Sequence, residues 1–176
     1  MARSVKHPPQ RPSRTQWPCT VGTVCVPPSG TSCSVAVVAV AVEVRGEGAV
    51  VCWGSNSSGQ LGDGTMEGDR RTPVAVLRLT DAVEIAMSSG HSCARRASGT
   101  VACWGSSRYG QLGNGTRGVD RRAPVAVSDL TDAVEIAVGG AHTCARRASG
   151  AVVCWGANHT GQIGDSTRTI QPPRTW

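Results

Sequence analysis

The chain has 176 residues with a formal net charge of +6, and it contains no Phe and one Tyr, which excludes an aromatic-rich core. Val and Ile favour strands, and the 22 Gly and 10 Pro favour turns, so the composition indicates an all-β protein. The basic excess lies mainly in residues 1–41, which hold four basic residues and no acid. A solvated tail accounts for this excess, so an arm that binds nucleic acid is only the alternative, and nucleic acid is not an expected partner.

Residues 1–30 are rich in Pro and Arg, and we expect a disordered or irregular basic leader there. The segment has no early apolar stretch, so no secretory signal is visible. The longest apolar run, Val35–Val42, is far shorter than the roughly 20 residues that cross a bilayer. The sequence therefore predicts no membrane span.

From residue 31 onward the chain repeats with a period of 51 residues. Cys52, Cys103 and Cys154 are each followed by Trp-Gly and, after four further residues, by Gly-Gln. Segment 81–116 aligns with 132–167 without a gap, and most positions are identical. Fixed-period repetition of this kind is typical of propellers and solenoids. We divide 31–176 into a degenerate repeat at about 31–80, a second at 81–131 and a truncated third at 132–176.

Each repeat contains about four short segments that favour strands. In the third repeat, AVEIAV (133–138) is followed by HTCARR and VVCWG on either side of a turn. A further short run, PVAV, lies at 124–127, and the third repeat lacks its counterpart, so we expect that strand to be lost. The fold class predicted is all-β, a partial β-propeller of about three four-stranded antiparallel blades.

Cysteines define the hairpin register within a repeat. A three-residue loop ending in Gly99 places Cys93 opposite Cys103, because Gly suits the left-handed position of that loop. The same register places Cys144 opposite Cys154. Disulfides are favoured for both pairs, with buried thiols, or metal sites that also use His91 and His142, as the alternatives. Disulfides would favour a secreted or cell-envelope location.

The first repeat departs from this pattern because Val42 occupies the position of Cys93, which leaves Cys52 without a partner in register. Either the first hairpin has grown or the first blade is degenerate. Cys19, Cys25 and Cys33 have no assignable partner.

The pattern His-x-Cys-Ala, Ser-Gly, Val-x-Cys-Trp-Gly-x4-Gly-Gln-Leu/Ile-Gly, with Pro-Val-x-Val in the first two copies, resembles the repeat of the regulator of chromosome condensation family over about 31–176. The paired cysteines are most similar to those of bacterial members. The resemblance implies a propeller, usually seven-bladed, and a role in protein binding. The family's founder is a guanine-nucleotide exchange factor for a small GTPase and binds chromatin. None of its exchange residues can be placed on this sequence, so exchange activity is the alternative function.

Residues that recur from one repeat to another are expected to be structural. The tryptophans would fill the space between blades, the glycines would adopt positive φ, the glutamines would bond loop backbone groups, and the histidines would donate hydrogen bonds. These residues are Trp53, Trp104, Trp155, Gly54, Gly105, Gly156, Gln60, Gln111, Gln162, His91 and His142.

Binding is expected where the copies differ. Between Trp-Gly and Gly-Gln the chain reads SNSS at 55–58, SSRY at 106–109 and ANHT at 157–160, and a second variable patch compares 66–68 with 117–119. Variable loops on a constant scaffold form binding surfaces, although drift in exposed loops gives the same pattern. The candidate binding residues are Asn56, Arg108, Tyr109, Asn158 and His159.

No phosphate loop, nucleophile elbow or metalloprotease helix is present in the sequence, and its acids mostly recur between repeats. We therefore expect no enzyme, no catalytic residue, no cofactor and no metal, but a scaffold with a protein partner. Propellers close with about 4–8 blades, and this sequence supplies about three. It is then a fragment, a unit that completes a ring by self-association, or an open array with exposed edges.

Overall fold

A computed structural model describes residues 23–25, 34–37, 40–46 and 48–175. Its regular secondary structure consists of strands, and no helix in the described part is long and apolar enough to span a membrane. Cys19, Cys33 and most of the expected leader lie outside the described residues.

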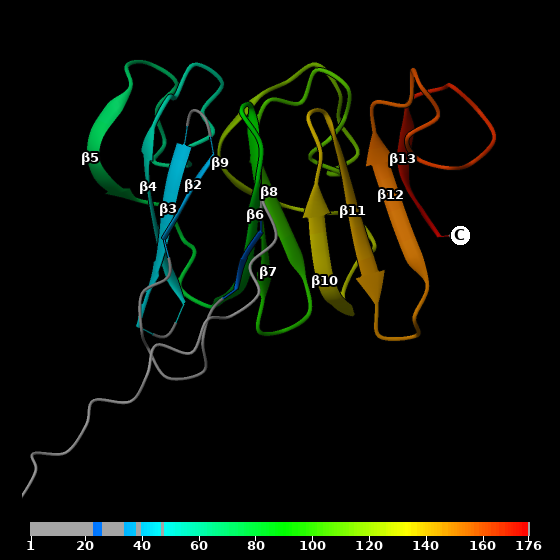
Figure 1. Ribbon diagram of the computed structural model, residues 1–176, viewed down its shortest axis with the longest axis horizontal. Coiled ribbons are helices and arrows are strands. Elements are labelled where there is room, and N and C mark those ends of the chain that lie inside the picture. The colour runs from blue at the N-terminus through cyan, green and yellow to red at the C-terminus, as the bar shows by residue number, and fades with distance from the viewer. Residues whose placement is uncertain (1–22, 26–33, 38–39, 47, 176) are drawn as a thin grey trace, which may run out of the picture.

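The strands form three antiparallel sheets that lie side by side along the molecule (Figure 1). The first blade has the order β2 (Ser34–Val37), β3 (Val40–Arg45), β4 (Ala49–Gly54) and β5 (Arg70–Ala75). The second has β6 (Ala82–Met87), β7 (His91–Arg96), β8 (Val101–Gly105) and β9 (Arg121–Ala126). The third has β10 (Ala133–Val138), β11 (His142–Arg147), β12 (Val152–Gly156) and β13 (Gln171–Thr175). The predicted partial propeller of four-stranded blades is confirmed.

A short additional strand, β1 (Thr23–Cys25), pairs antiparallel with β6 at the edge of the second blade and places Cys25 opposite Glu84. This strand falls within the segment where we expected irregular structure. Two of its three residues are the β-branched Thr23 and Val24, which suit a strand, and β6 provides an unpaired edge for them.

Hairpin registers follow the turn chemistry of the sequence. Cys93 lies opposite Cys103 and Cys144 opposite Cys154, and both pairs form disulfides. Gly99 adopts a φ of +83° and donates its backbone N–H to Arg96 O, which closes the predicted three-residue loop. For these four cysteines the disulfides exclude the two alternatives, buried free thiols and a metal site.

In the first blade Val42 lies opposite Cys52, and the hairpin turn between Arg45 and Ala49 is short. The blade is therefore degenerate in sequence and its hairpin has not grown. Cys52 is a buried free thiol. Burial, followed by the nearby Asp63 carboxylate, raises its pKa to about 12, so the group stays protonated and unreactive at neutral pH.

The fourth strand of the third blade is present, and the expectation that it is lost was wrong. β13 pairs with β12 through Thr175, Arg174 and Gln171, with an irregularity between the second and third pairs. Pro172 and Pro173 fall at that irregularity. Because β13 is an edge strand, the missing N–H groups of its prolines remove no ladder bond that the sheet requires.

Two apolar clusters fill the spaces between neighbouring blades. The first joins Val44, Val50, Cys52, Leu61, Val76 and Leu79 of blade one to Ala82, Ile85, Met87, Ala94 and Trp104 of blade two. The second joins Ala86, Cys93, Val101, Cys103, Leu112, Val127 and Leu130 to Ala133, Ile136, Ala145, Val153 and Trp155 of blade three. The core thus lies between sheets, so each blade depends on its neighbour for burial.

Long connections after β4, β8 and β12 lie together at the upper end of the molecule in Figure 1. We call the surface formed by residues 55–69, 106–120 and 157–170 the loop end. The hairpin turns between β3 and β4, β7 and β8, and β11 and β12 lie at the opposite end (Figure 1), and the variable segments of all three repeats share the loop end.

Candidate functional site

The three connections of the loop end are held by the same side-chain bonds. Gln60 Oε1 accepts the backbone N–H of Ser58 at 2.8 Å, Gln111 Oε1 that of Tyr109 at 2.9 Å, and Gln162 Oε1 that of Thr160 at 3.0 Å. Each glutamine therefore fixes the backbone of the variable segment that precedes it, and the variable side chains project from a constant base.

Asn56 and Asn158, which we expected to contact a partner, are fully buried. Their Oδ1 atoms accept the backbone N–H groups of Leu61 and Ile163, each at 3.1 Å. Their Nδ2 groups donate to Thr65 and Thr167, in each case the threonine nine residues further along the chain. The expectation was wrong because these amides close the loop internally, and Ser107 is likewise buried at the same position in the second repeat.

The other three candidates come together between two blades. The rings of Tyr109 and His159 meet edge to face with centroids 5.1 Å apart, and the guanidinium of Arg108 lies 5.6 Å from the Tyr109 ring centroid. Arg108 and His159 are exposed and Tyr109 is half-buried. Residues separated by 50 positions in sequence thus form one exposed group, which we call the Arg108–Tyr109–His159 cluster.

Two hollows lie between neighbouring loops and include the second variable patch. One of about 660 Å³ is lined by Thr65, Met66, Glu67 and Arg70 of the first loop and by Arg122. The other, of about 200 Å³, is lined by Thr116 and Arg117 of the second loop and by Ile170 and Pro172. Both hollows lie where two blades meet, so a ligand there would contact two repeats at once.

The repeats differ in one charged pair beneath these hollows. Arg70 donates from Nε to Asp63 at 3.2 Å in the first blade. Asn114 occupies the position of Asp63 in the second blade, and the buried Nε of Arg121 makes no hydrogen bond with any described residue. A carboxylate is therefore missing at this point of the second repeat.

Tryptophan and glutamine connect the blades through one recurring arrangement. Trp104 Nε1 donates to Gln60 O at 2.8 Å, and Trp155 Nε1 donates to Gln111 O at 2.9 Å. Both indoles are fully buried, whereas Trp53 of the first blade is only partly buried. A glycine of the preceding loop leaves room for each indole. We call the glutamine carbonyl with this glycine, Gly62 or Gly113, the tryptophan socket.

One hydroxyl that the sequence-based expectations did not include completes each socket. Ser92 Oγ donates to Gln60 O at 3.0 Å, and Thr143 Oγ1 donates to Gln111 O at 2.9 Å. Each hydroxyl residue lies opposite the tryptophan of its own hairpin. The sequence does carry a signal for them, since a Ser or Thr stands between His and Cys in both the second and the third repeat.

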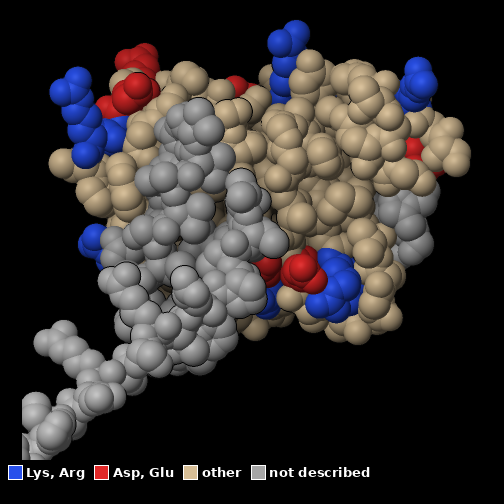
Figure 2. All heavy atoms as spheres, in the orientation of Figure 1, with Lys and Arg blue, Asp and Glu red and all other residues tan. Residues whose placement is uncertain are grey.

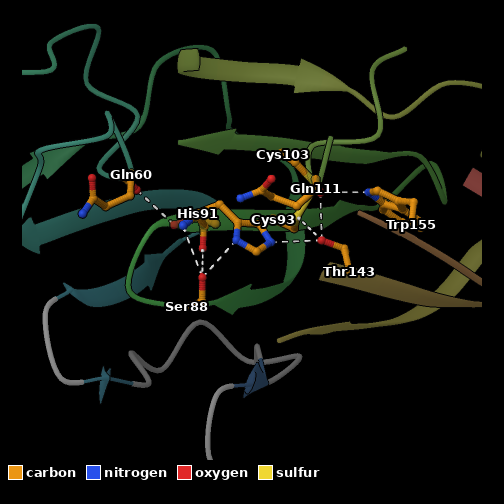
Figure 3. Close-up of a disulfide and its surroundings, with 9 residues drawn as sticks. Gln60, Ser88, His91, Cys93, Cys103, Gln111, Thr143 and Trp155 are labelled. Atoms are coloured by element: carbon orange, nitrogen blue, oxygen red, sulfur yellow. Dashed lines mark hydrogen bonds between the residues drawn. A yellow bond between two sulfur atoms is a disulfide. The ribbon is translucent and has the colours of Figure 1, made fainter. Parts of the chain in front are cut away.

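His91 lies at the centre of the interface between the second and third blades (Figure 3). Because the Thr143 hydroxyl donates to Gln111 O, it accepts a hydrogen bond from His91 Nε2 at 3.0 Å. Nδ1 then accepts from Ser88 Oγ at 2.9 Å, which assigns the neutral Nε2–H tautomer. Burial, reinforced by His142, lowers the pKa of His91 to about 3.

His142 occupies the equivalent position in the third blade, where burial also lowers the pKa of its ring. No described residue forms a hydrogen bond with its ring: Gly139 stands in place of Ser88, and none of the described residues supplies a hydroxyl as Thr143 does for His91. Among the described residues no three His, Cys, Asp or Glu side chains gather in a way that could hold a metal ion.

Comparison with solved structures gives the same architecture. Human WBSCR16 superposes with a TM-score of 0.71 at 21% identity, over 84% of this chain and 38% of that protein. Prp20p of Saccharomyces cerevisiae, a protein studied for its binding to Gsp1p and histones, gives 0.71 at 18% identity over 81% of this chain and 37% of its own. Yeast RCC1 (Prp20) bound to Kap60 gives 0.65 at 22% identity, over 78% and 33%. At these identities the likeness concerns the fold.

Curated relatives match in sequence over part of their length. The human probable E3 ubiquitin-protein ligase HERC6 is 35% identical over 128 residues, 70% of this chain and 12% of that protein. Human HERC2, an E3 ubiquitin-protein ligase, is 38% identical over 128 residues, 70% of this chain and 3% of its own. The chain therefore spans only a small part of these relatives.

The model of the regulator of chromosome condensation (RCC1) repeat matches residues 47–95 and 98–146, which together make up more than half of the chain. A second model of the same repeat matches 82–111 and 133–162. These segments contain the hairpins, disulfides and tryptophan sockets described above. The chain belongs to the RCC1 repeat family.

Proposed function

We propose that this chain is a non-catalytic scaffold that binds another protein through its loop end. The observation that carries the proposal is the Arg108–Tyr109–His159 cluster, in which the exposed His159 of the third blade contacts the half-buried Tyr109 of the second. Solved relatives of this fold bind proteins: yeast RCC1 (Prp20) is bound to Kap60. Aromatic and Arg side chains are the residue types most enriched among those that dominate binding energy.

The cluster is already ordered before a partner binds. Gln111 holds the Tyr109 backbone, His159 packs against the Tyr109 ring edge, and Arg108 lies over its face. Such contacts reduce the conformational entropy that these long side chains lose on binding. The cluster is therefore suited to anchor a partner that spans the second and third blades.

The partner surface is expected to be acidic. The loop end of the second and third blades carries Arg108, Arg117 and Arg168, and Figure 2 shows basic side chains projecting from this end of the molecule. The acids of the same loops are engaged internally: Asp120 accepts the Ser107 N–H at 2.8 Å. Opposite potentials across an interface speed association and select the partner.

Asp165 is held in the same way. Desolvation would raise its pKa, but hydrogen bonds from Thr167 and Asn158 outweigh this and lower it. It stays ionised at neutral pH and its oxygens are directed into its own loop, so it does not offset the exposed arginines where a partner would dock.

The disulfides support a proposal about where the protein is located. Two hairpin disulfides are consistent with an oxidising compartment, and hence with a secreted or envelope protein of the bacterial, paired-cysteine type. The HERC ligases are similar to this chain over 12% and 3% of their own length, so no ligase chemistry is proposed here. The exchange-factor alternative remains a prediction, to be tested by nucleotide release from a panel of small GTPases.

The test compares proteins captured by the native chain with those captured by a triple variant, Arg108→Ala, Tyr109→Ala and His159→Ala. Ser98→Ala in an exposed hairpin turn at the opposite end serves as the control. A specific partner should be retained by the control and lost by the triple variant. Once that partner is identified, Tyr109→Ala alone should raise the dissociation constant measured by calorimetry about tenfold or more. Binding that is indifferent to all three changes would contradict the proposal.

A further inference from the structure

Arg121 of the second blade lacks the partners that its counterpart in the first blade has. That counterpart, Arg70, donates from Nε to the Asp63 carboxylate at 3.2 Å, and its Nη groups donate to a threonine hydroxyl and two backbone carbonyls of its own loop. Arg121 keeps one long contact among the described residues, from Nη2 to Thr116 Oγ1 at 3.5 Å. Its buried Nε has no hydrogen-bond partner there. The guanidinium of Arg121 is therefore an unpaired donor group.

One difference between the repeats explains why the partner is missing. Asn114 stands where the first repeat has Asp63, and its Oδ1 accepts the N–H and the hydroxyl of Thr116 at 3.2 and 2.9 Å. Asp63 Oδ1 binds the threonine of its own loop in the same way, and its Oδ2 accepts from the arginine. The atom of Asn114 that corresponds to Oδ2 is the amide Nδ2, a donor, which cannot accept a bond from Arg121.

The charge of the surrounding loop changes in the same direction. Segment 55–71 of the first repeat holds three acids and two arginines, whereas segment 106–122 of the second holds one acid and four arginines. That one acid, Asp120, accepts the Ser107 N–H at 2.8 Å and forms no ion pair with a described residue. The segment that contains Arg121 therefore carries an excess of positive charge, which attracts anions.

A hollow large enough for a small anionic group lies beside this arginine. The smaller of the two hollows described above, of about 200 Å³, is lined by Thr116 and Arg117, and Thr116 is the residue that Arg121 contacts. In the first repeat the equivalent arginine itself lines the larger hollow. Arg121 is only partly buried, although its Nε is fully covered, so a ligand meets the outer Nη groups of the guanidinium.

We propose that Arg121, together with Arg117, binds a carboxylate group supplied from outside the chain. The chemical class of the ligand is inferred from the first repeat, where the same arginine is paired with the carboxylate of Asp63. A planar guanidinium forms two parallel hydrogen bonds with a carboxylate, which gives the pair both strength and a defined geometry. Arg117 adds a second positive charge at the wall of the hollow.

Two sources carry this chemistry: the Asp or Glu side chain of another protein, and a small free carboxylate such as acetate. The first source rests on the proposed scaffold function, because the site belongs to the loop end. The carboxylate site itself does not depend on that function, since it follows from the unpaired guanidinium of Arg121 and the hollow beside it.

An NMR titration followed through the arginine Nε–H resonances tests the site directly. With sodium acetate the Arg121 resonance should shift until the response saturates, and sodium chloride at the same ionic strength should not reproduce that shift. Arg70 is the internal control, because its Nε is already bound to Asp63 and should not respond. Arg121→Lys identifies the resonance by removing it.

Asn114→Asp places a carboxylate within the site and should abolish the saturable response to acetate. Ser98→Asp is the matched control, because it adds the same charge at an exposed hairpin turn at the opposite end of the molecule. This variant should bind acetate as the native chain does. The dispersion of the amide resonances in the same spectra checks that each variant remains folded.

The blocked peptide acetyl-Gly-Glu-Gly-amide distinguishes the two sources. Binding at least as tight as that of acetate supports an acidic side chain of a protein, and weaker binding supports a small free carboxylate. An Arg121 resonance that responds to neither probe overturns the proposal, as does a response that survives Asn114→Asp or appears equally at Arg70. The titration requires no protein partner, so failure to capture a partner at the loop end and failure of this site are separate results.

Discussion

Replacing Trp104 by Ala tests whether the blades are held together by their tryptophans. The side chain is fully buried, and its Nε1 donates to Gln60 O at 2.8 Å. Truncating a buried Trp costs about 3–5 kcal/mol in free energy of unfolding. Ser92 still donates to the same carbonyl at 3.0 Å, so no acceptor is left unpaired, and we expect a loss of about 4 kcal/mol.

Trp53→Ala is the matched control because the same residue occupies the same register position but is only partly buried. We expect it to cost less, about 2–3 kcal/mol, because part of the Trp53 side chain is already exposed and less apolar area leaves contact. Urea unfolding followed by circular dichroism measures the free energy of unfolding of both variants. An equal loss for the two variants would refute the argument that burial between blades sets the cost.

Gly62→Ala provides an independent check on the same contact. Its φ of +70° strains any other residue by about 1–2 kcal/mol, and its Cβ would also lie 2.8 Å from Trp104 Nε1. Combining it with Trp104→Ala removes the clash but not the strain, so the double variant should be more stable than the sum of the two losses by about 1–3 kcal/mol. Gly164 also has a positive φ (+81°), but a Cβ placed there meets no heavy atom within 4 Å, so Gly164→Ala should show the strain alone. Additive losses for Gly62 and Trp104 would refute the socket geometry.

Three further predictions follow from the differences between repeats. Val42→Cys should form a third disulfide with Cys52 and raise the free energy of unfolding by about 2–3 kcal/mol. The bond is detected because the oxidised variant has a lower mass than the reduced one and the Cys52 thiol no longer reacts. Asn114→Asp should pair with Arg121 as Asp63 pairs with Arg70 and raise the free energy of unfolding by up to about 1 kcal/mol; a lower value in urea unfolding would contradict this. The pKa of His91 is lowered to about 3 from a usual value near 6.5, so the unfolded chain binds a proton that the folded chain does not. Stability should then fall as the pH decreases below about 6.5, with a slope near 1.4 kcal/mol per pH unit. His91→Gln should flatten that slope, and an unchanged slope would show that another group is responsible.

The hairpins could be predicted from the sequence because each one is set by residues that are close together in the chain. The three-residue turn ending in Gly99 sets the register of β7 and β8, and that register alone places Cys93 opposite Cys103. Repetition then transfers the same argument to Cys144 and Cys154. The family, the blade count and the disulfides were accordingly accessible without coordinates.

Predictions for the variable loops were less complete because local sequence does not show which way a loop residue points. Asn56 and Arg108 both belong to four-residue segments that vary between repeats, yet one closes its loop internally and the other is exposed. The contact between Tyr109 and His159 joins two repeats, so it depends on how the blades pack. β13 was missed for a related reason: its backbone pairing with β12 outweighs the poor strand preference of its prolines.

The sequence by itself determined the repeat, its strands and its cysteine pairs, since each follows from residues close together in the chain. It assigned the same role to Trp53, Trp104 and Trp155 because their surroundings in sequence are the same. Only the tertiary structure distinguished them. Burial depends on whether another blade lies alongside: Trp104 and Trp155 occupy a socket in the preceding blade, whereas no described residue provides one for Trp53.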